Sequence, residues 1–178
     1  GGLTGIILGD STLDINVHDT YFVVGHFHIV MGLSAAFGMI AGIYHWFPKM
    51  FGRVMNNKLG YIHFWVTIVS TYGAFFPMHF LGLAGVPRRY YTNSNFPLFD
   101  DFVDLNQMVS IFAIISFVGQ LIFLYNFIYS IFRGPKSPKN PWNSNTLEWT
   151  APVEHIHGNW PGEIPEVHRW PYDYSKPG

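Results

Sequence analysis

Three long stretches without charge constrain the fold of this chain more than any other feature. Asp, Glu, Lys and Arg are absent from Thr20–Pro48, Leu59–Pro87 and Leu105–Phe132, each of which is 28 or 29 residues long. A helix that crosses a membrane needs about 20 largely apolar residues. A soluble core could bury one such segment, but three in succession predict an all-α membrane protein with three transmembrane helices.

The two ends of the chain differ from these stretches. The opening run, Gly-Gly-Leu-Thr-Gly-Ile-Ile-Leu, is typical of the end of a fourth apolar helix and not of a signal peptide. Past Gly134 lie eight of the twelve prolines and four of the six tryptophans. Prolines at this density prevent long helices. We therefore expect a helical part, residues 1–134, and an extended Pro/Trp-rich tail, residues 135–178, that docks by its aromatic side chains.

The charged residues between the stretches predict an orientation. Basic residues follow the first and third stretches, and an excess of basic residues marks the inner side of a membrane: Lys49, Arg53, Lys58, Arg133, Lys136 and Lys139. The tail is then on the inner side, and Asp100, Asp101 and Asp104 are on the outer side. The chain has no cysteine, which excludes disulfides and iron–sulfur clusters, and its net charge of −1 gives no sign of a nucleic-acid partner.

Two histidines separated by a single residue, His26 and His28, lie near the start of the first stretch. Consecutive residues of an α-helix are about 100° apart, so these side chains point about 200° apart and cannot easily share one metal. They could instead offer one imidazole to each of two cofactors on opposite sides of the helix. Buried histidines with ordinary hydrogen bonds are the alternative. Gly25, which has no side chain, would let a flat macrocycle approach the backbone, whereas Gly38 and Gly42 have a spacing typical of close helix packing.

Two polar pairs flank the apolar stretches. His18 and Asp19 stand before the first stretch and could bind a divalent cation or relay protons. The alternative is a helix start at which Asp19 or Thr20 caps free backbone N–H groups. Arg88 and Arg89 follow the second stretch, where they could either extend to the interface or bind an anion. Guanidinium groups pair well with carboxylates, and two of them on the outer side favour an anionic partner.

The other histidines are less informative. His45, His63 and His79 are single residues near helix ends, for which structural roles are expected. His155 and His157 could form a metal site in the tail, although a solvated tail is the simpler interpretation. The chain has no sequence motif of a hydrolase or of a nucleotide-binding enzyme.

The run His-Asp-Thr-Tyr-Phe-Val-Val-Gly-His-Phe-His, from His18 to His28, closely resembles the tenth transmembrane helix of subunit I of the haem–copper oxidases. The resemblance continues through His-Trp-Phe-Pro at 45–48 and Phe-Phe-Pro-Met-His-Phe-Leu-Gly-Leu-Ala-Gly-Val-Pro-Arg-Arg-Tyr at 75–90. It covers residues 1 to about 132, and its motifs are highly specific. The tail resembles tails of bacterial members only weakly.

The resemblance implies a role for each matching residue. His26 matches the proximal ligand of the high-spin haem, the catalytic centre where O₂ binds opposite copper, and His28 matches an axial ligand of the low-spin haem. Other positions match residues that do not bind iron. Arg88 and Arg89 match the pair that contacts the haem propionates, and Asp14 matches an acid near those propionates on the proton-exit side. His18 and Asp19 match the ligands of a magnesium or manganese ion.

The resemblance also implies the function and the partners. The chain would be the C-terminal portion of the catalytic subunit of a proton-pumping cytochrome c oxidase. There, electrons pass from a low-spin haem to a high-spin haem and copper centre that reduces O₂ to water. Haems a and a3 are expected, with copper held by residues outside this chain. The partners would be the remainder of subunit I, the copper-bearing subunit II, subunit III, cytochrome c or an associated cytochrome, and the lipid of a bacterial inner membrane.

Two other functions are compatible with the same residues. One is a haem–copper oxidase that oxidises quinol, although Asp19 favours the cytochrome c branch. The other is a bis-haem electron-transfer subunit without oxygen chemistry. A purely structural membrane protein with packed histidines would carry no pigment at all.

Overall fold

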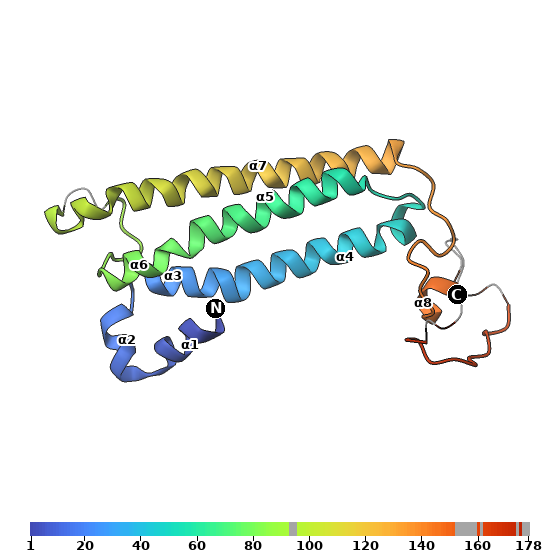
Figure 1. Cartoon of the computed structure of the whole chain (residues 1–178), viewed down its shortest axis with the longest axis horizontal. Coiled ribbons are helices and arrows are strands. Elements are labelled where there is room, and N and C mark those ends of the chain that lie inside the picture. The colour runs from blue at the N-terminus through green and yellow to red at the C-terminus, as the bar shows by residue number, and fades with distance from the viewer. Residues whose placement is uncertain (93–95, 152–159, 161, 174, 176–178) are drawn as a thin grey trace.

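The computed structural model describes the whole chain apart from residues 93–95, 152–159, 161, 174 and 176–178. The described residues are mostly helical and form two isolated β-bridges but no strand. Three segments are long and apolar enough to cross a membrane: Tyr21–Phe51, Asn57–Leu83 and Pro97–Arg133. The predicted all-α architecture with three spans is therefore confirmed (Figure 1).

The first span consists of α3 (Tyr21–Phe27), a π-helical turn (His28–Leu33) and α4 (Ser34–Phe51). It begins at Thr20, whose hydroxyl accepts a hydrogen bond from the Phe22 N–H at 3.2 Å, the capping role expected of Thr20. It ends at Gly52, whose φ of 64° closes the helix in the left-handed conformation that glycine favours. Nothing in the sequence predicts the π-helical turn, and such turns often lie at functional sites.

The second span consists of α5 (Asn57–Phe75) and α6 (Pro77–Leu83). The side chain of Asn56 caps its start by accepting a hydrogen bond from the Leu59 N–H at 3.2 Å. Pro77 has no backbone N–H and therefore begins a new helix at α6. The third span starts with a short 3-10 helix (Pro97–Phe102) and continues as the 31-residue α7 (Val103–Arg133), about 46 Å long at 1.5 Å per residue.

Two short helices precede the first span. The first of them, α1 (Gly2–Gly9), is apolar, as its sequence suggests. Asp10 ends α1 and caps α2 (Ser11–Val17) by accepting a hydrogen bond from the Thr12 N–H at 2.8 Å. Both helices lie beside α3 (Figure 1), so residues from the start of the chain reach the first span.

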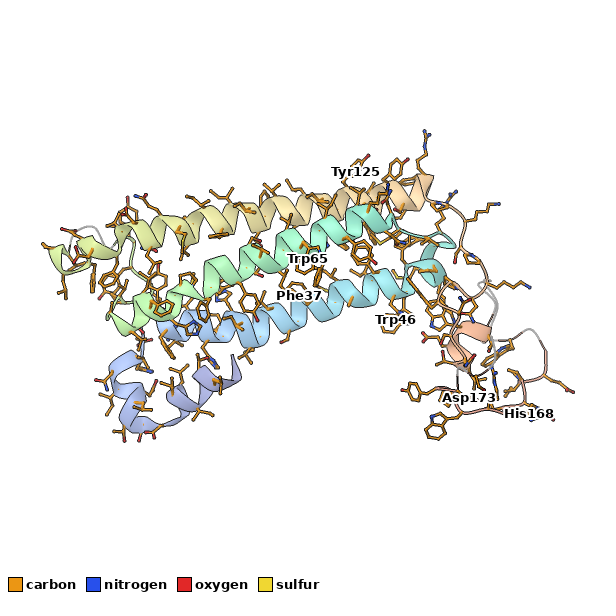
Figure 2. All side chains as sticks on the ribbon, viewed as in Figure 1. Phe37, Trp46, Trp65, Tyr125, His168 and Asp173 are labelled. Carbon is orange, nitrogen blue, oxygen red and sulfur yellow. The ribbon has the colours of Figure 1, made fainter. Side chains whose placement is uncertain are left out.

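The helices pack in two main pairs, α5 along α7 and α3 against α6. Two glycines allow these close approaches. An added Cβ at Gly82 of α6 would lie 2.1 Å from the Phe22 backbone N, and one at Gly73 of α5 would lie 2.6 Å from the Phe112 ring. By contrast, α4 and α5 leave an open, largely apolar pocket of about 570 Å³ between them, lined in part by Phe37 and Trp65 (Figure 2).

The tail packs against the far end of α4 (Figure 1). Trp142 stacks on His45 with ring centroids 5.7 Å apart, and Trp149 of the one-turn helix α8 (Leu147–Thr150) meets the same imidazole edge-on at 5.1 Å. We call this region the tail end of the bundle. The opposite end, formed by α1, α2, α3 and α6, is the site end. Trp46 at the tail end donates a hydrogen bond from its indole N–H to Glu148 of α8 at 2.5 Å (Figure 2).

Candidate functional site

The backbone at the start of the first span is joined to the end of the second. The Tyr21 N–H donates to the Val86 carbonyl, and the Arg88 N–H donates to the Asp19 carbonyl, each at 3.0 Å. Between these bonds Thr20 and Pro87 form an isolated bridge. The site end therefore places α3 firmly against α6, although the two lie in different spans.

His26 points from α3 toward α1. Its Nδ1 lies 3.0 Å from the Gly1 carbonyl oxygen and 2.8 Å from the Thr4 hydroxyl oxygen. Both atoms can accept a hydrogen bond, so they favour the neutral tautomer with its proton on Nδ1. An added Cβ at Gly5 would lie 3.1 Å from the His26 Cε1 atom, so this glycine leaves room for the ring. The arrangement keeps Nε2 of His26 available as a ligand.

His28 points toward α5 instead. Its Nδ1 lies 2.9 Å from the Val24 carbonyl oxygen, one turn earlier in α3. Its imidazole is stacked on Phe75 of α5 at 4.3 Å with 9° between the planes, and on Phe27 at 4.4 Å with 29°. Both ring faces are therefore covered, and the ring edge with Nε2 is what remains to bind a ligand. His28 is also the first residue of the π-helical turn.

The two imidazoles share a chemical pattern but contact different neighbours. Each has its Nδ1 next to a backbone carbonyl, and among the described residues neither Nε2 has a hydrogen bond. A histidine that binds a metal through Nε2 usually donates its other ring N–H to such an acceptor, which fixes the tautomer and the ring direction. The donor set and its orientation thus fit two separate axial ligands, one on the α1 side of the helix and one on the α5 side.

Gly25 has a different role from the one that the sequence suggests. An added Cβ at Gly25 would lie 2.8 Å from the Phe75 carbonyl oxygen and 3.0 Å from the His79 ring, so this glycine permits close helix packing. Within the described part of the chain, Gly38 has no neighbouring atom within 4 Å of an added Cβ, and Gly42 meets only Trp46 of its own helix. Close packing therefore occurs at Gly25 and not at the Gly38–Gly42 pair.

The polar pairs that flank the spans come together at the site end. Arg88 forms an ion pair with Asp19, and its Nε donates a hydrogen bond to Oδ1 of Asp19 at 2.7 Å. This hydrogen bond and the positive charge of Arg88 hold the pKa of Asp19 below its ordinary value of 3.8. Asp19 has a positive φ of 57°, in the left-handed region that non-glycine residues rarely adopt. Arg88 thus has an anionic partner within the chain, while Arg89 is exposed.

His18 lies between two carboxylates. Its Nε2 is 3.7 Å from Oδ2 of Asp19, the oxygen that does not accept from Arg88 Nε, and its Nδ1 is 3.4 Å from Oδ2 of Asp14. His18 and Asp19 could therefore be ligands of one cation. Within the described residues, no group of three or more His, Asp or Glu side chains is placed to hold a metal. Magnesium and manganese prefer about six ligands, so waters or another chain would have to complete such a site.

The remaining histidines lie elsewhere. His45 is at the tail end, and His63 and His79 are buried in α5 and α6, each with an Nε2 that has no hydrogen-bond partner among the described residues. His155 and His157 are outside the described residues. Sequence reasoning missed Thr4 and Phe75, which orient His26 and His28. Both are far from these histidines in the sequence, so no short motif could have indicated the contacts.

Comparison with known proteins identifies the family. A family model described as "Cytochrome C and Quinol oxidase polypeptide I" matches residues 1–122, about two thirds of the chain. The chain belongs to this family. The resemblance found in the sequence is thereby confirmed.

The curated relatives cover nearly the whole chain. The "Alternative cytochrome c oxidase subunit 1" of Bradyrhizobium diazoefficiens is 46% identical over 180 residues, which include 100% of this chain. The "Cytochrome c oxidase subunit 1" of Thermostichus vulcanus is 44% identical over 98% of the chain, and that of Cereibacter sphaeroides 45% over 87%. The chain spans only 28 to 31% of the length of these relatives. The tail of this chain is therefore included in its similarity to the first two relatives.

Proposed function

We propose that this chain is the C-terminal portion of the catalytic subunit of a proton-pumping terminal oxidase that takes electrons from cytochrome c and reduces O₂ to water. The observation that carries the proposal is the pair His26 and His28. Each has its Nδ1 fixed by a backbone carbonyl, and the two rings face different neighbours. Membership of the oxidase subunit I family supports the same interpretation.

The two imidazoles would be the axial ligands of two haems. His28 would hold a low-spin haem on the α5 side, where stacking between Phe27 and Phe75 keeps its ring from turning. His26 would hold a high-spin haem on the α1 side, where Gly1 and Thr4 fix its tautomer. When bound, the haems, of types a and a3, and a copper held by residues outside this chain supply the electron-transfer and oxygen chemistry.

The polar residues of the site end would bind the charged groups around the haems. Arg88 and Arg89 would contact the haem propionates, with Asp14 close to them on the proton-exit side. His18 and Asp19 would supply two ligands to a magnesium or manganese ion at the boundary with subunit II. The ion pair of Arg88 with Asp19 supports a link between these two sites, because a single carboxylate faces both the guanidinium and His18.

The complex around this chain would include the rest of subunit I, the copper-bearing subunit II, subunit III and a cytochrome c that is free or attached, in a bacterial inner membrane. Residues 1–134 would form the haem-binding part and residues 135–178 a tail on the inner side. The curated relatives are named cytochrome c oxidases, which favours cytochrome c over quinol as the donor. A quinol-oxidising enzyme is the second candidate, because the description of the family includes both types.

Optical spectra of the purified complex test the proposal. Reduced-minus-oxidised spectra, with and without carbon monoxide, should reveal one low-spin haem and one high-spin haem that binds carbon monoxide. His28→Ala should remove the low-spin signal and His26→Ala the carbon-monoxide-binding one. His45→Ala, on the same span but enclosed by tryptophans, is the matched control and should leave both signals in place.

The same spectra separate the alternatives. Two low-spin haems without carbon-monoxide binding would indicate a bis-haem electron-transfer subunit. A colourless complex would indicate a structural protein. If His26→Ala and His28→Ala both retain both signals, the assignment of the axial ligands is wrong. Turnover with reduced cytochrome c but not with a quinol would establish the donor.

A further inference from the structure

His79 of α6 is a buried imidazole that the proposed function does not use. It is 7% exposed, and its Nδ1 lies 3.1 Å from the Phe76 carbonyl oxygen of its own helix. That carbonyl can only accept a hydrogen bond, so the proton of a neutral His79 is on Nδ1 and the lone pair is on Nε2. The Nε2 atom is buried and has no hydrogen-bond partner among the described residues.

The ring of His79 fits against α3 at the position of Gly25. An added Cβ at Gly25 would lie 3.0 Å from Cε1 and 3.1 Å from Nδ1 of His79. One turn earlier, Phe22 meets the same ring edge-on, with centroids 4.9 Å apart and planes at 90°. His79 thus fills a notch on the buried face of α3 that only a glycine provides.

This contact lies between the directions of the two proposed ligands. At about 100° per residue, His26 points about 100° to one side of Gly25, and His28 points about 60° to the other side. A side chain wedged at Gly25 therefore resists rotation of α3 in either sense. Any rotation of the helix would turn both imidazoles away from their ligands together.

The chemistry of the notch indicates why an imidazole occupies it. A phenyl ring would fill nearly the same space without burying a polar atom. A buried acceptor without a partner is destabilising, so Nε2 is expected to have a partner in the assembled protein. The partner must be a hydrogen-bond donor, because a neutral imidazole with its proton on Nδ1 can only accept at Nε2.

We propose that His79 is a positioning residue with two parts to its role. Its Nε2 accepts a hydrogen bond from an N–H or O–H donor outside the described residues. The ring, held in this way, fixes the rotation of α3 and so the direction of His26 and His28. The first part concerns the fold of the assembled subunit and is independent of haem. The second part rests on the proposed function.

Three variants of the complete oxidase complex test the proposal. His79→Phe keeps the ring volume but removes both nitrogens. His79→Gln restores a polar amide close to the position of Nε2 and is the rescue variant. His63→Phe is the matched control, because His63 is also buried, at 3% exposed, and also has an Nε2 without a partner among the described residues, but it lies in α5, away from Gly25.

Two readouts separate the parts of the proposal. The thermal midpoint of the complex reports on the hydrogen bond without reference to haem. We expect it to fall in His79→Phe, where the donor loses its partner, and to recover in His79→Gln. The resonance Raman iron–histidine stretch of the high-spin haem and the absorption band of the low-spin haem report on the ligand directions. Both should shift in His79→Phe, recover in His79→Gln and stay unchanged in His63→Phe.

The outcomes are distinguishable. A thermal midpoint in His79→Phe equal to that of the unaltered complex overturns the hydrogen bond. Haem signals that do not shift in His79→Phe, or that shift equally in His63→Phe, overturn the positioning role. If His79→Phe does not assemble, His79→Gln decides, and its failure to assemble would also overturn the proposal. The proposed function fails separately, if His26→Ala and His28→Ala leave the haem signals intact.

Discussion

Histidines at the two ends of the first span are held in opposite ways. At the site end, His26 and His28 are fixed through Nδ1 by backbone carbonyls, and an edge of each ring is left for a ligand. At the tail end, the His45 ring is enclosed by tryptophan rings, with Trp142 stacked on it and Trp149 against it. The same side chain keeps one ring nitrogen free at the site end and is a packing element at the tail end.

The difference indicates how a histidine suited to bind a metal can be told from one that only packs. A histidine that binds a metal must have one ring nitrogen fixed and the other accessible, whereas a histidine that only packs needs contact over its ring faces. His28 shows that both can be combined, because stacking with Phe75 and Phe27 restrains the ring while its edge stays open. The stacking of His28 alone would therefore mislead, and the position of the free nitrogen decides.

The largest effect is expected from a change at the close contact between α3 and α6, which holds the site end together. Gly82→Ala would place a Cβ 2.1 Å from the Phe22 backbone N, so α3 and α6 would have to separate. Overpacking of this kind typically costs 1–3 kcal/mol, occasionally more. We expect loss of both haem signals, measured as the haem-to-protein ratio of the purified complex.

Gly38→Ala, on the same span as α3, is the control for this variant, because no described atom lies within 4 Å of its added Cβ. It should retain a normal haem content. A Gly82→Ala complex with a full complement of haem would contradict the importance of the α3–α6 contact, and an equal loss in Gly38→Ala would place the critical packing elsewhere.

A second change should affect stability at the tail end without affecting the site end. Trp149 is 2% exposed, packs on His45 and lies beneath Lys49, with the Lys49 Nζ 5.2 Å from its ring centroid. Trp149→Ala should cost about 3–5 kcal/mol, as expected for a buried tryptophan. We expect faster cleavage of the tail by protease and a lower thermal midpoint, with unchanged haem spectra.

Trp170 provides the comparison for Trp149, since it lies in the same tail but is 71% exposed. Trp170→Ala should leave protease sensitivity nearly unchanged. A change in the haem spectra of Trp149→Ala would contradict this expectation and show that the two ends of the span are coupled.

Local features of the chain were predictable from the sequence, and contacts between distant segments were not. The three spans follow from the absence of charge over lengths that only a membrane or a large core can accommodate. The pattern of His26 and His28 is visible because both lie within one helical turn. The acceptors of His26 are 22 and 25 residues away, and Phe75 reaches His28 from another span, so no periodicity indicates them.

The ion pair at the site end illustrates the same limit. The sequence predicts an anionic partner for Arg88 and a metal-binding role for Asp19, but it does not indicate that the two residues bind each other. They are 69 residues apart and meet only because α3 packs against α6. The π-helical turn after Phe27 was likewise not predictable, because its residues would suit an ordinary α-helix equally well.

A third, smaller effect is expected from the acceptors of His26. Thr4→Val removes the hydroxyl that lies 2.8 Å from Nδ1 but leaves the Gly1 carbonyl at 3.0 Å, so the tautomer should persist. Loss of a hydrogen bond to the second nitrogen of a metal-binding histidine typically lowers metal affinity or activity by about 10–100-fold. Because one acceptor remains, we expect activity to fall by about tenfold or less. Turnover of the complex measures the size of this loss, and the iron–histidine stretch of the high-spin haem shows which haem is affected.

Thr12→Val on α2 is a suitable comparison, because Thr12 is exposed and is not one of the residues that hydrogen-bond His26. It should give the spectrum of the unaltered complex. A shift of the low-spin haem in Thr4→Val, instead of the high-spin one, would mean that His26 and His28 have exchanged roles.

The smallest expected effect on stability concerns the ion pair of Asp19 and Arg88. The pKa of Asp19 is lowered, first by the hydrogen bond from Arg88 and also by the charge of that group. A carboxylate with a lowered pKa contributes stability that is fully present above its ordinary value of 3.8 and is lost as the pH falls through the lowered value. Because the Asp19 side chain is 58% exposed, solvent screens the pair and the contribution is small.

Arg88→Gln removes this contribution, so the thermal midpoint should be slightly lower than that of the unaltered complex above pH 3.8 and should converge with it at more acidic pH. The same variant bears on the cation site, since Arg88 occupies Oδ1 of Asp19 and leaves Oδ2 facing His18. Loss of the guanidinium frees a second oxygen and removes a positive charge, so Mn²⁺ should bind more tightly, as measured by electron paramagnetic resonance. Weaker Mn²⁺ binding in Arg88→Gln would instead mean that Arg88 holds Asp19 in the orientation that the cation requires.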